Sequence, residues 1–185
     1  MLAIIAPGQG SQTPGMLSPW LEDAQIRTMA QEISDAIGLD VVRLGTTADA
    51  DEIKDTANAQ PLIVATGLIS AHALGAAGSF SYVAGHSVGE ITAAAIAGAL
   101  TPIDAMKLVR ARGVEMAKAA GVTPSGMAAV LGGDRQVVLS AIAELGLVAA
   151  NDNGGLRFFQ IGTARISAGI FVWLIVTQLW RQGLL

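Results

Sequence analysis

One short segment constrains the fold of this chain more than any other, Gly85-His86-Ser87-Val88-Gly89. A β-prone pair, Tyr82 and Val83, precedes it, and an alanine-rich run with helical propensity, residues 88–100, follows it. A strand, a sharp turn and a helix in that order form a nucleophile elbow, in which the turn pushes the serine hydroxyl outward. Glycine is needed on both sides because a Cβ there would collide with the closely packed backbone.

The elbow also places a hydrogen-bond donor beside the serine. The N–H of Val88 lies at the start of the expected helix, where unpaired N–H groups and the positive end of the helix dipole stabilise negative charge. We therefore predict that Ser87 is a nucleophile and that the Val88 N–H can bind an oxyanion. The alternative interpretation is a tight strand-to-helix turn that contains an incidental serine.

Composition and charge exclude several classes of protein. Apolar residues make up 52% of the chain and charged residues 14%, with few aromatics, which indicates closely packed helices on a sheet. A net charge of -4 without a basic cluster argues against a nucleic-acid partner. Cysteine is absent, so disulfides, thiolate metal sites and a cysteine nucleophile are excluded. The start, MLAIIAPGQG, lacks the long apolar run and basic flank of a signal peptide, and we expect a cytoplasmic protein.

A glycine-rich loop follows the first predicted strand. Residues 2–6 predict a short buried strand that ends at Pro7, and GQGSQT follows. The loop lacks the third glycine of GxGxxG, which argues against a dinucleotide site. It could instead present the Gln9 amide to a neighbouring site, because flanking glycines let the backbone approach closely. A plain surface turn is the alternative.

Helical segments alternate with these strands, which favours a parallel α/β sheet over a helical bundle. Gly38 ends the first helix, Asn58 and Pro61 give start signals for the helix at about 58–74, and Thr101 with Pro102 caps the helix at 103–120. The helical segments are expected at residues 19–37, at 49–54 as an acidic helix start, at about 58–74 and at 103–120.

Two arginines border the apolar stripe of the helix expected at 103–120. At about 100° per residue, Arg110 and Arg112 lie on opposite borders of that stripe. Either could place its guanidinium beside the serine. More commonly, an arginine at the border of an apolar stripe extends its side chain so that the guanidinium is in water. Periodicity does not choose between them.

The pattern changes after residue 125. A strand at 126–131, a helix at 134–145 and a strand at 147–150 are expected, and a turn at 151–155 leads to another apolar run. This order of short elements predicts the opening of a small α+β subdomain.

Four ordered motifs together resemble one family. LAIIAPGQGSQTPGM, QPLIVATGLISAHAL, YVAGHSVGEITA and KLVRARGVEMAKA followed by GMAAVLG are similar to bacterial malonyl-CoA:acyl carrier protein transacylases, the loading acyltransferases of fatty acid synthesis. The resemblance runs from Met1 to about Gly155. It implies an α/β-hydrolase-like large domain at residues 1–125, which would be partial, and the start of an inserted ferredoxin-like small domain at 126–160. Residues 161–185 would be an atypical apolar tail.

The resemblance also implies an activity and site residues. Ser87 would take malonyl from malonyl-CoA as an ester and pass it to the phosphopantetheine thiol of acyl carrier protein, with no cofactor and no metal. Gln9 and the Val88 N–H match the family's oxyanion hole, and Arg112 matches the residue that holds the free carboxylate of malonate. A bidentate guanidinium would favour malonyl over acetyl, because acetyl would leave the arginine unpaired. Val88, which follows the serine, favours malonyl over methylmalonyl.

The catalytic base is where the sequence departs from the family. A serine hydroxyl needs a base near neutral pH, and the family's histidine lies beyond the small domain. No histidine follows His86 here, His86 itself should point away in a tight turn, and His72 on an apolar helix is best explained by packing. We therefore expect either an impaired malonyltransferase or a catalytically silent fragment that binds a coenzyme A thioester or carrier protein. A generic serine esterase is a weaker third reading, because it needs the same histidine.

The final segment no longer resembles the family. The run 166–180 is uncharged between Arg165 and Arg181, and as a helix it would span about 22 Å, short of the roughly 30 Å of a bilayer core. We expect no membrane span, and we interpret the chain as truncated or frame-altered after about residue 155. Such an apolar tail would be prone to aggregation.

Overall fold

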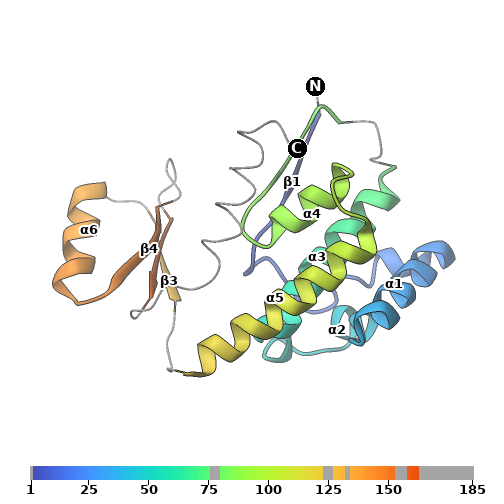
Figure 1. Cartoon of the computed structure of the whole chain (residues 1–185), viewed down its shortest axis with the longest axis horizontal. Coiled ribbons are helices and arrows are strands. Elements are labelled where there is room, and N and C mark those ends of the chain that lie inside the picture. Colours follow the sequence, from blue (N-terminus) through green and yellow to red (C-terminus); the bar gives the residue numbers. More distant parts are fainter. Residues whose placement is uncertain (1, 76–79, 123–126, 132–133, 153–157, 163–185) are drawn as a thin grey trace. The chain divides into compact units, whose positions relative to one another are not determined.

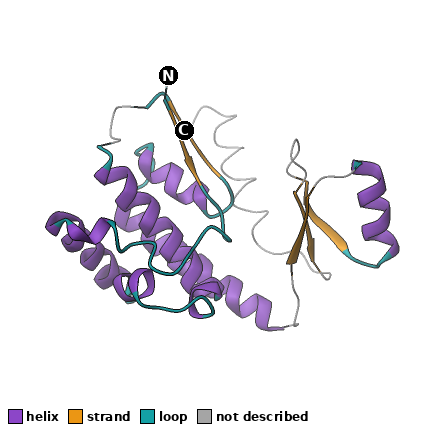
Figure 2. Ribbon diagram, turned by 180° about the vertical axis from the view of Figure 1, so that it is seen from behind, coloured by secondary structure: helices purple, strands orange, loops and turns teal. Residues whose placement is uncertain are grey.

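A computed structural model of the chain describes residues 2–75, 80–122, 127–131, 134–152 and 158–162 (Figure 1). These residues belong to two compact units, of which the first continues to Lys118 and the second begins at Ala119. Helices make up most of the first unit, and a small sheet dominates the second (Figure 2). The expected mixed α/β architecture is confirmed, and the domain boundaries drawn from the sequence remain predictions.

The first unit contains one parallel strand pair. Strand β1 (Ala3–Ala6) pairs with β2 (Tyr82–Gly85), so that the two strands end together at Ala6 and Gly85. Parallel strands need a long crossover connection, which the intervening helices provide. The prediction that the first strand is buried is wrong, because Ile5 is 76% exposed whereas Ala6 is 3% exposed. Successive side chains of a strand point to opposite faces, so Ala6 and Ile5 face different surroundings, and helix α4 (Gly89–Ile96) contacts both strands.

Helix α1 begins later than the sequence pattern suggested. Asp23 is extended and its carboxylate accepts hydrogen bonds from the N–H groups of Gln25 and Ile26, so the α-helix starts after this cap. The residues before Asp23 form only the 3-10 turn η1 (Trp20–Glu22). Gly38 ends α1 in the left-handed conformation, with a φ of 60°, as predicted.

The start of α3 also corrects the sequence prediction. The Asp55 carboxylate accepts from the Ala57 N–H and begins the helix three residues before Asn58, so Pro61 lies inside α3 rather than in its first turn. The acidic stretch before it forms only the 3-10 turn η2 (Glu52–Lys54). The sequence pattern did not predict α2 (Val41–Thr46). The helices of the first unit are α1 (Ala24–Ile37), α2 (Val41–Thr46), α3 (Thr56–Ala73), α4 (Gly89–Ile96) and α5 (Pro102–Val122).

The cap predicted for α5 is confirmed. Thr101 Oγ1 accepts from the Asp104 N–H at 3.1 Å and donates to the Asp104 carboxylate at 2.7 Å. Two-way capping of this kind satisfies one orphan N–H at the helix start. Pro102 suits the first helical position because it has no N–H to leave unpaired.

The hydrophobic core of the first unit is centred on α3. Its middle contributes side chains that are almost fully excluded from water, and α1, α2, α4 and α5 pack around them. The core residues from α3 are Leu62, Ile63, Val64, Ala65, Leu68 and Ile69. Because α3 has apolar side chains on all sides, it is a buried central helix and a fixed support for polar side chains at its N-terminal end.

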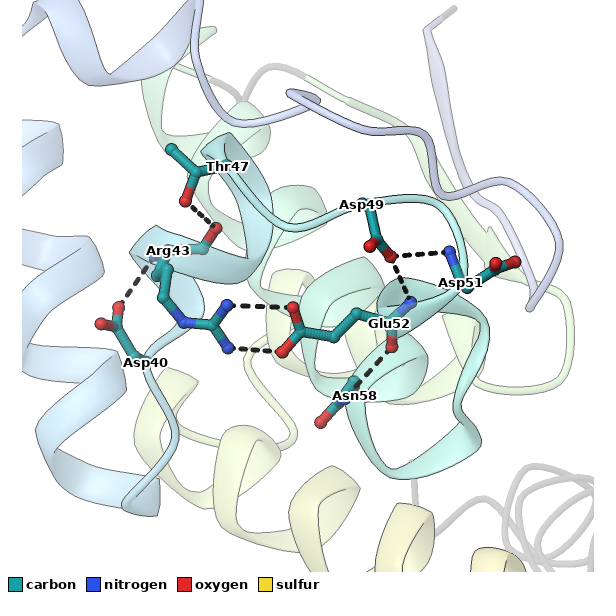
Figure 3. Close-up of polar contacts among 7 residues, drawn as sticks. All are labelled: Asp40, Arg43, Thr47, Asp49, Asp51, Glu52 and Asn58. Atoms are coloured by element: carbon teal, nitrogen blue, oxygen red, sulfur yellow. Dashed lines mark hydrogen bonds and ion pairs between the residues drawn. The ribbon is translucent and has the colours of Figure 1, made fainter.

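A polar cluster on the surface ties the start of α3 to α2 (Figure 3). Arg43 forms a bidentate ion pair with Glu52, and the Asn58 amide donates to the Glu52 carbonyl at 3.1 Å. Asp49 accepts from the Glu52 N–H at 2.8 Å, and Asp40 caps α2 at the Arg43 N–H. The hydrogen bond from Arg43 lowers the pKa of Glu52. These contacts join α2, η2 and α3 into one surface framework.

The second unit is an antiparallel sheet with one helix. Strand β5 lies between β3 and β4 and is antiparallel to both, with an irregularity in register between Ala149 and Asn151. The predicted order of strand, helix, strand and further strand is confirmed, whereas the turn predicted at 151–155 lies outside the described residues from position 153 onward, and residues 151 and 152 belong to β4. The elements are β3 (Met127–Leu131), α6 (Arg135–Glu144), β4 (Val148–Asp152) and β5 (Phe158–Gly162).

The predicted apolar tail, residues 161–185, lies outside the described residues from position 163 onward, and so does the prediction made for the run 166–180. Within the part of the chain that the structure describes, no helix has the length and apolar character needed to cross a membrane.

Candidate active site

Ser87 occupies a strained position between β2 and α4. Among the described residues it is the one non-glycine residue with a positive φ, 53°. The turn is closed by hydrogen bonds from the His86 N–H to the Ala6 carbonyl at 3.0 Å and from the Gly89 N–H to the His86 carbonyl at 2.9 Å. A non-glycine residue in this region costs on the order of 1–3 kcal/mol and persists only where its surroundings fix it. Ser87 is exposed, as the elbow motif predicts.

Both glycines of the elbow are required by close backbone contacts. A Cβ at Gly85 would overlap the backbone of Gly89 and Glu90, and a Cβ at Gly89 would lie 2.5 Å from the Pro7 carbonyl oxygen. Real Cβ contacts are never this short, so any larger residue would move the backbone of the turn. The steric reason given for these glycines from the sequence is confirmed.

The structure separates the two candidate arginines. Arg112 Nη2 lies 3.4 Å from Ser87 Oγ, and its Nη1 donates to the side-chain oxygen of Gln60. Arg110 Nη1 instead donates to the Ala57 carbonyl at 3.0 Å. Arg112 is therefore the arginine that faces the serine, whereas Arg110 joins α5 to α3.

The contact of Arg110 follows from the proline inside α3. Pro61 has no N–H, so it cannot donate to the carbonyl of Ala57 four residues earlier, and that acceptor is free for the guanidinium. Gly113 permits the same close approach of the helices, because a Cβ there would lie 3.1 Å from the Thr56 carbonyl oxygen. The close pairing of α5 with the first turns of α3 thus fixes the position of the α5 backbone that carries Arg112.

The glycine-rich loop lies against the elbow. A Cβ at Gly8 would be 2.5 Å from His86 Nδ1, so this glycine allows the loop to contact the turn. Gln9 is exposed, its amide nitrogen donates to Thr56 Oγ1 at 3.1 Å, and its amide oxygen accepts from Gln60 at 3.4 Å. The loop residue predicted for the site is therefore linked through Gln60 to Arg112.

Val88 contributes its backbone to the site. Its side chain is fully buried in the core, which anchors the first turn of α4 below Ser87. Among the described residues its N–H donates no hydrogen bond. A free N–H directly after the serine, at the start of a helix, is suited to binding an anion.

Two functional candidates were missed in the sequence. Gln60 is fully buried, and the signal for it was a long polar side chain at the start of an apolar helix. Glu90 is half-buried, and the signal was the S-x-x-E spacing from Ser87, which is that of a capping box. Its carboxylate accepts from the Ser87 N–H, which supports the strained residue.

Charges at the site shift two pKa values. Burial raises the pKa of Glu90, while the hydrogen bond from Ser87 and the charges of Arg112 and His86 oppose this rise. Burial lowers the pKa of Arg112, and the Glu90 carboxylate partly offsets that effect. A partly dry arginine gains more from a carboxylate ligand than a fully hydrated one.

Neither histidine is engaged with the serine. His72 is exposed near the C-terminal end of α3, and the exposed His86 ring lies against Gly8. In the described part of the chain, no hydrogen bond joins either ring to Ser87. No group of three or more metal-binding side chains is present among the described residues.

A sequence model of the acyl transferase domain matches residues 4–155. The chain belongs to this acyl transferase family. The matched range includes the glycine-rich loop, the elbow and Arg112, which are the parts that meet around Ser87.

Individual relatives give a more specific comparison. The chain is 54% identical over 166 residues to the malonyl CoA-acyl carrier protein transacylase of Mycobacterium tuberculosis, an alignment that covers 88% of this chain and 55% of that protein. The crystal structure of MCAT from Mycobacterium tuberculosis superposes with a TM-score of 0.80 at 47% identity, and covers 93% of this chain and 57% of the other. The chain therefore spans about half the length of these relatives.

A third comparison includes a partner protein. A structure described as a type II PKS acyl-carrier protein in complex with its malonyl-transacylase matches with a TM-score of 0.73 at 26% identity, and covers 86% of this chain and 52% of the other.

Proposed function

We propose that this chain carries the nucleophile and the carboxylate-binding residue of a malonyl-CoA:acyl carrier protein transacylase. The observation that carries the proposal is the 3.4 Å distance from Arg112 Nη2 to Ser87 Oγ, at a serine held outward by a strained turn. The name of the relative in Mycobacterium tuberculosis supports the substrate pair, and the complex of a related malonyl-transacylase with an acyl-carrier protein supports the partner.

The reaction has two steps. Ser87 Oγ attacks the thioester carbonyl of malonyl-CoA, its proton passes to a base, and the carbon–sulfur bond breaks so that coenzyme A leaves as the thiol. The phosphopantetheine thiol of the carrier protein then attacks the malonyl ester and releases Ser87. One pocket serves both steps because only the acyl group is held between them. No cofactor enters this scheme.

Donors around Ser87 would stabilise the tetrahedral intermediates. The Val88 N–H lies at the helix start and donates to no residue in the described part of the chain, and the Gln9 amide lies on the neighbouring loop. Removal of one oxyanion donor typically lowers kcat by about 100- to 1000-fold.

Arg112 would select the acyl group. A malonyl ester on Ser87 carries a free carboxylate that can take two charge-assisted hydrogen bonds from this guanidinium, whereas acetyl offers it none. The partial burial of Arg112, which lowers its pKa, increases the cost of leaving it unpaired.

Among the described residues, no side chain is placed to act as the general base for Ser87. The chain has two histidines, and within its described part neither is hydrogen-bonded to Ser87. We therefore expect these 185 residues to form the acyl-enzyme slowly, because serine attack then depends on solvent or on a base from another polypeptide. The second candidate function is a catalytically silent fragment that binds a coenzyme A thioester or carrier protein.

The same proposal includes a more specific fold for each of the two units. The parallel pair β1–β2 with the elbow helix supports an α/β-hydrolase-like core, and the strand order β3-β5-β4 with α6 after β3 supports part of a ferredoxin-like domain.

Intact mass measurement after incubation with malonyl-CoA tests the proposal. We expect the mass of one malonyl group on the wild type, mapped to Ser87 by peptide analysis, and no adduct on Ser87→Ala. Added imidazole should raise the acylation rate, because it can take the Ser87 proton that neither His72 nor His86 is placed to accept. Saturable binding without an adduct would favour the silent fragment, and absence of both binding and adduct would overturn both functions.

A further inference from the structure

Gln60 is a polar side chain without access to water. It is 0% exposed, yet it lies in α3 directly before the apolar run that forms the core. A buried amide left without partners costs about 1–3 kcal/mol, so its hydrogen bonds account for its presence. Those bonds go to the site residues Arg112 and Gln9 and to the Met116 sulfur at 3.1 Å.

The geometry of these bonds assigns each end of the amide. The Gln60 oxygen accepts from Arg112 Nη1, and its nitrogen donates toward the Gln9 oxygen at 3.4 Å. With Nη1 held in this way, Nη2 is the part of the guanidinium that faces Ser87. One buried amide therefore contacts both the candidate carboxylate-binding residue and the candidate oxyanion residue.

We propose that Gln60 is the positioning residue that aims Arg112 at the acyl carboxylate while adding no negative charge of its own beside the guanidinium. A neutral amide orients a guanidinium through one hydrogen bond, whereas a carboxylate at this place would pair with it as a salt bridge. This proposal rests on the proposed malonyl transfer, since it names what fixes selectivity in that reaction.

The backbone around Gln60 makes it a fixed support. Pro61 follows it, and the carbonyl of Ala57 is bound to Arg110 of α5. The two helices are thus joined two residues along α5, and three along α3, from the contact between Gln60 and Arg112. Because Gln60 and Arg112 are held at a short, fixed distance, the Arg112 guanidinium keeps its orientation without further contacts.

Two substitutions of Gln60 distinguish the loss of the Arg112 orientation from the addition of a negative charge beside Arg112. Gln60→Met keeps a similar volume and removes the acceptor, so Arg112 loses its orientation. Gln60→Glu keeps the acceptor and adds a charge that pairs with Arg112. The matched control is Gln31→Glu on the exposed face of α1, where Gln31 bonds only to Asp35 among the described residues.

Calorimetry compares the affinity of each variant for malonyl-CoA with its affinity for acetyl-CoA. We expect the wild-type preference for malonyl-CoA to fall about tenfold in Gln60→Met and further in Gln60→Glu, with acetyl-CoA affinity unchanged. Gln31→Glu should keep the wild-type ratio. An unchanged ratio in both Gln60 variants would overturn the proposal.

A second measurement does not depend on the substrate. In the free protein, the ¹⁵N guanidinium resonances of Arg112 should show slow exchange, and Gln60→Met should abolish it while circular dichroism reports the same helix content. If the wild type shows no malonyl preference, the proposed function fails, and these resonances still decide whether Gln60 holds Arg112. Unchanged resonances in Gln60→Met would refute the positioning role.

Discussion

At Ser87, several neighbours together hold a backbone conformation that serine on its own disfavours. The φ of 53° is fixed by the hydrogen bonds of the turn and by the two glycines that allow its tight path. Glu90 accepts the Ser87 N–H and is itself close to the charge of Arg112. The nucleophile, the supporting carboxylate and the arginine are therefore one electrostatically coupled group.

Glu90→Gln should change how stability depends on pH. Burial raises the pKa of Glu90 in the folded state, so its stabilising contribution is complete at pH values below the unfolded pKa and is lost as pH rises through the folded pKa. Glutamine does not titrate and can still accept the Ser87 N–H. The difference in unfolding free energy, variant minus wild type, should therefore increase as pH rises from about 4 to neutral.

Urea unfolding across that pH range measures this difference. A constant difference at all pH values would show that the environment of Glu90 does not disfavour its charge.

At the scale of elements, the pairing of α3 with α5 positions the arginine. Pro61 frees the Ala57 carbonyl, Arg110 binds it, and Gly113 allows the backbones to approach. None of these residues contacts Ser87 through a described hydrogen bond. Their effect on the site is exerted through the position of the helix that carries Arg112.

Gly113→Ala tests the closeness of this pairing. The new Cβ would lie 3.1 Å from the Thr56 carbonyl oxygen and 3.3 Å from the Ala57 Cα, and backbone atoms must move to accept it. We expect a loss of about 1–3 kcal/mol in unfolding free energy and a weaker malonyl preference. Thermal or urea unfolding provides the first value and calorimetry the second.

Gly121→Ala in the same helix is the matched control, because a Cβ there meets nothing within 4 Å among the described neighbours. It should be neutral or stabilising by up to about 1 kcal/mol through helix propensity. Equal effects of the two substitutions would rule out a steric role for Gly113.

At the scale of the whole molecule, the chain forms two compact units, and the described buried cluster lies entirely within the first. Since burial of apolar surface is the main favourable term in folding, α3, at the centre of this cluster, should be the most stably folded element of the first unit.

Hydrogen exchange measured by mass spectrometry should show the two units separately. Amides of α3 are expected to exchange slowly, through opening of the whole first unit, and those of β3 and β5, which belong to the other unit, to exchange as a separate group. Equal protection of α3 and β3 would show that the units unfold together.

Local patterns in the sequence predicted several elements correctly, because their causes are local. The elbow depends on glycines next to the serine, the α5 cap on Thr101, and the end of α1 on Gly38. The start of α3 was misplaced because Asp55 competes with Asn58 as a cap, and only the local backbone decides between two such candidates.

The sequence by itself determined the turn that exposes Ser87, the order of elements and the family to which the chain belongs, since these follow from residues close together in the chain. Only the tertiary structure decided between Arg110 and Arg112 and brought Gln60 to the site. Those outcomes depend on contacts between α3 and α5, whose partners are 52 and 53 residues apart, and helical periodicity carries no information about such distances. The exposure of Ile5 was decided in the same way, by which face of the strand pair another segment covers.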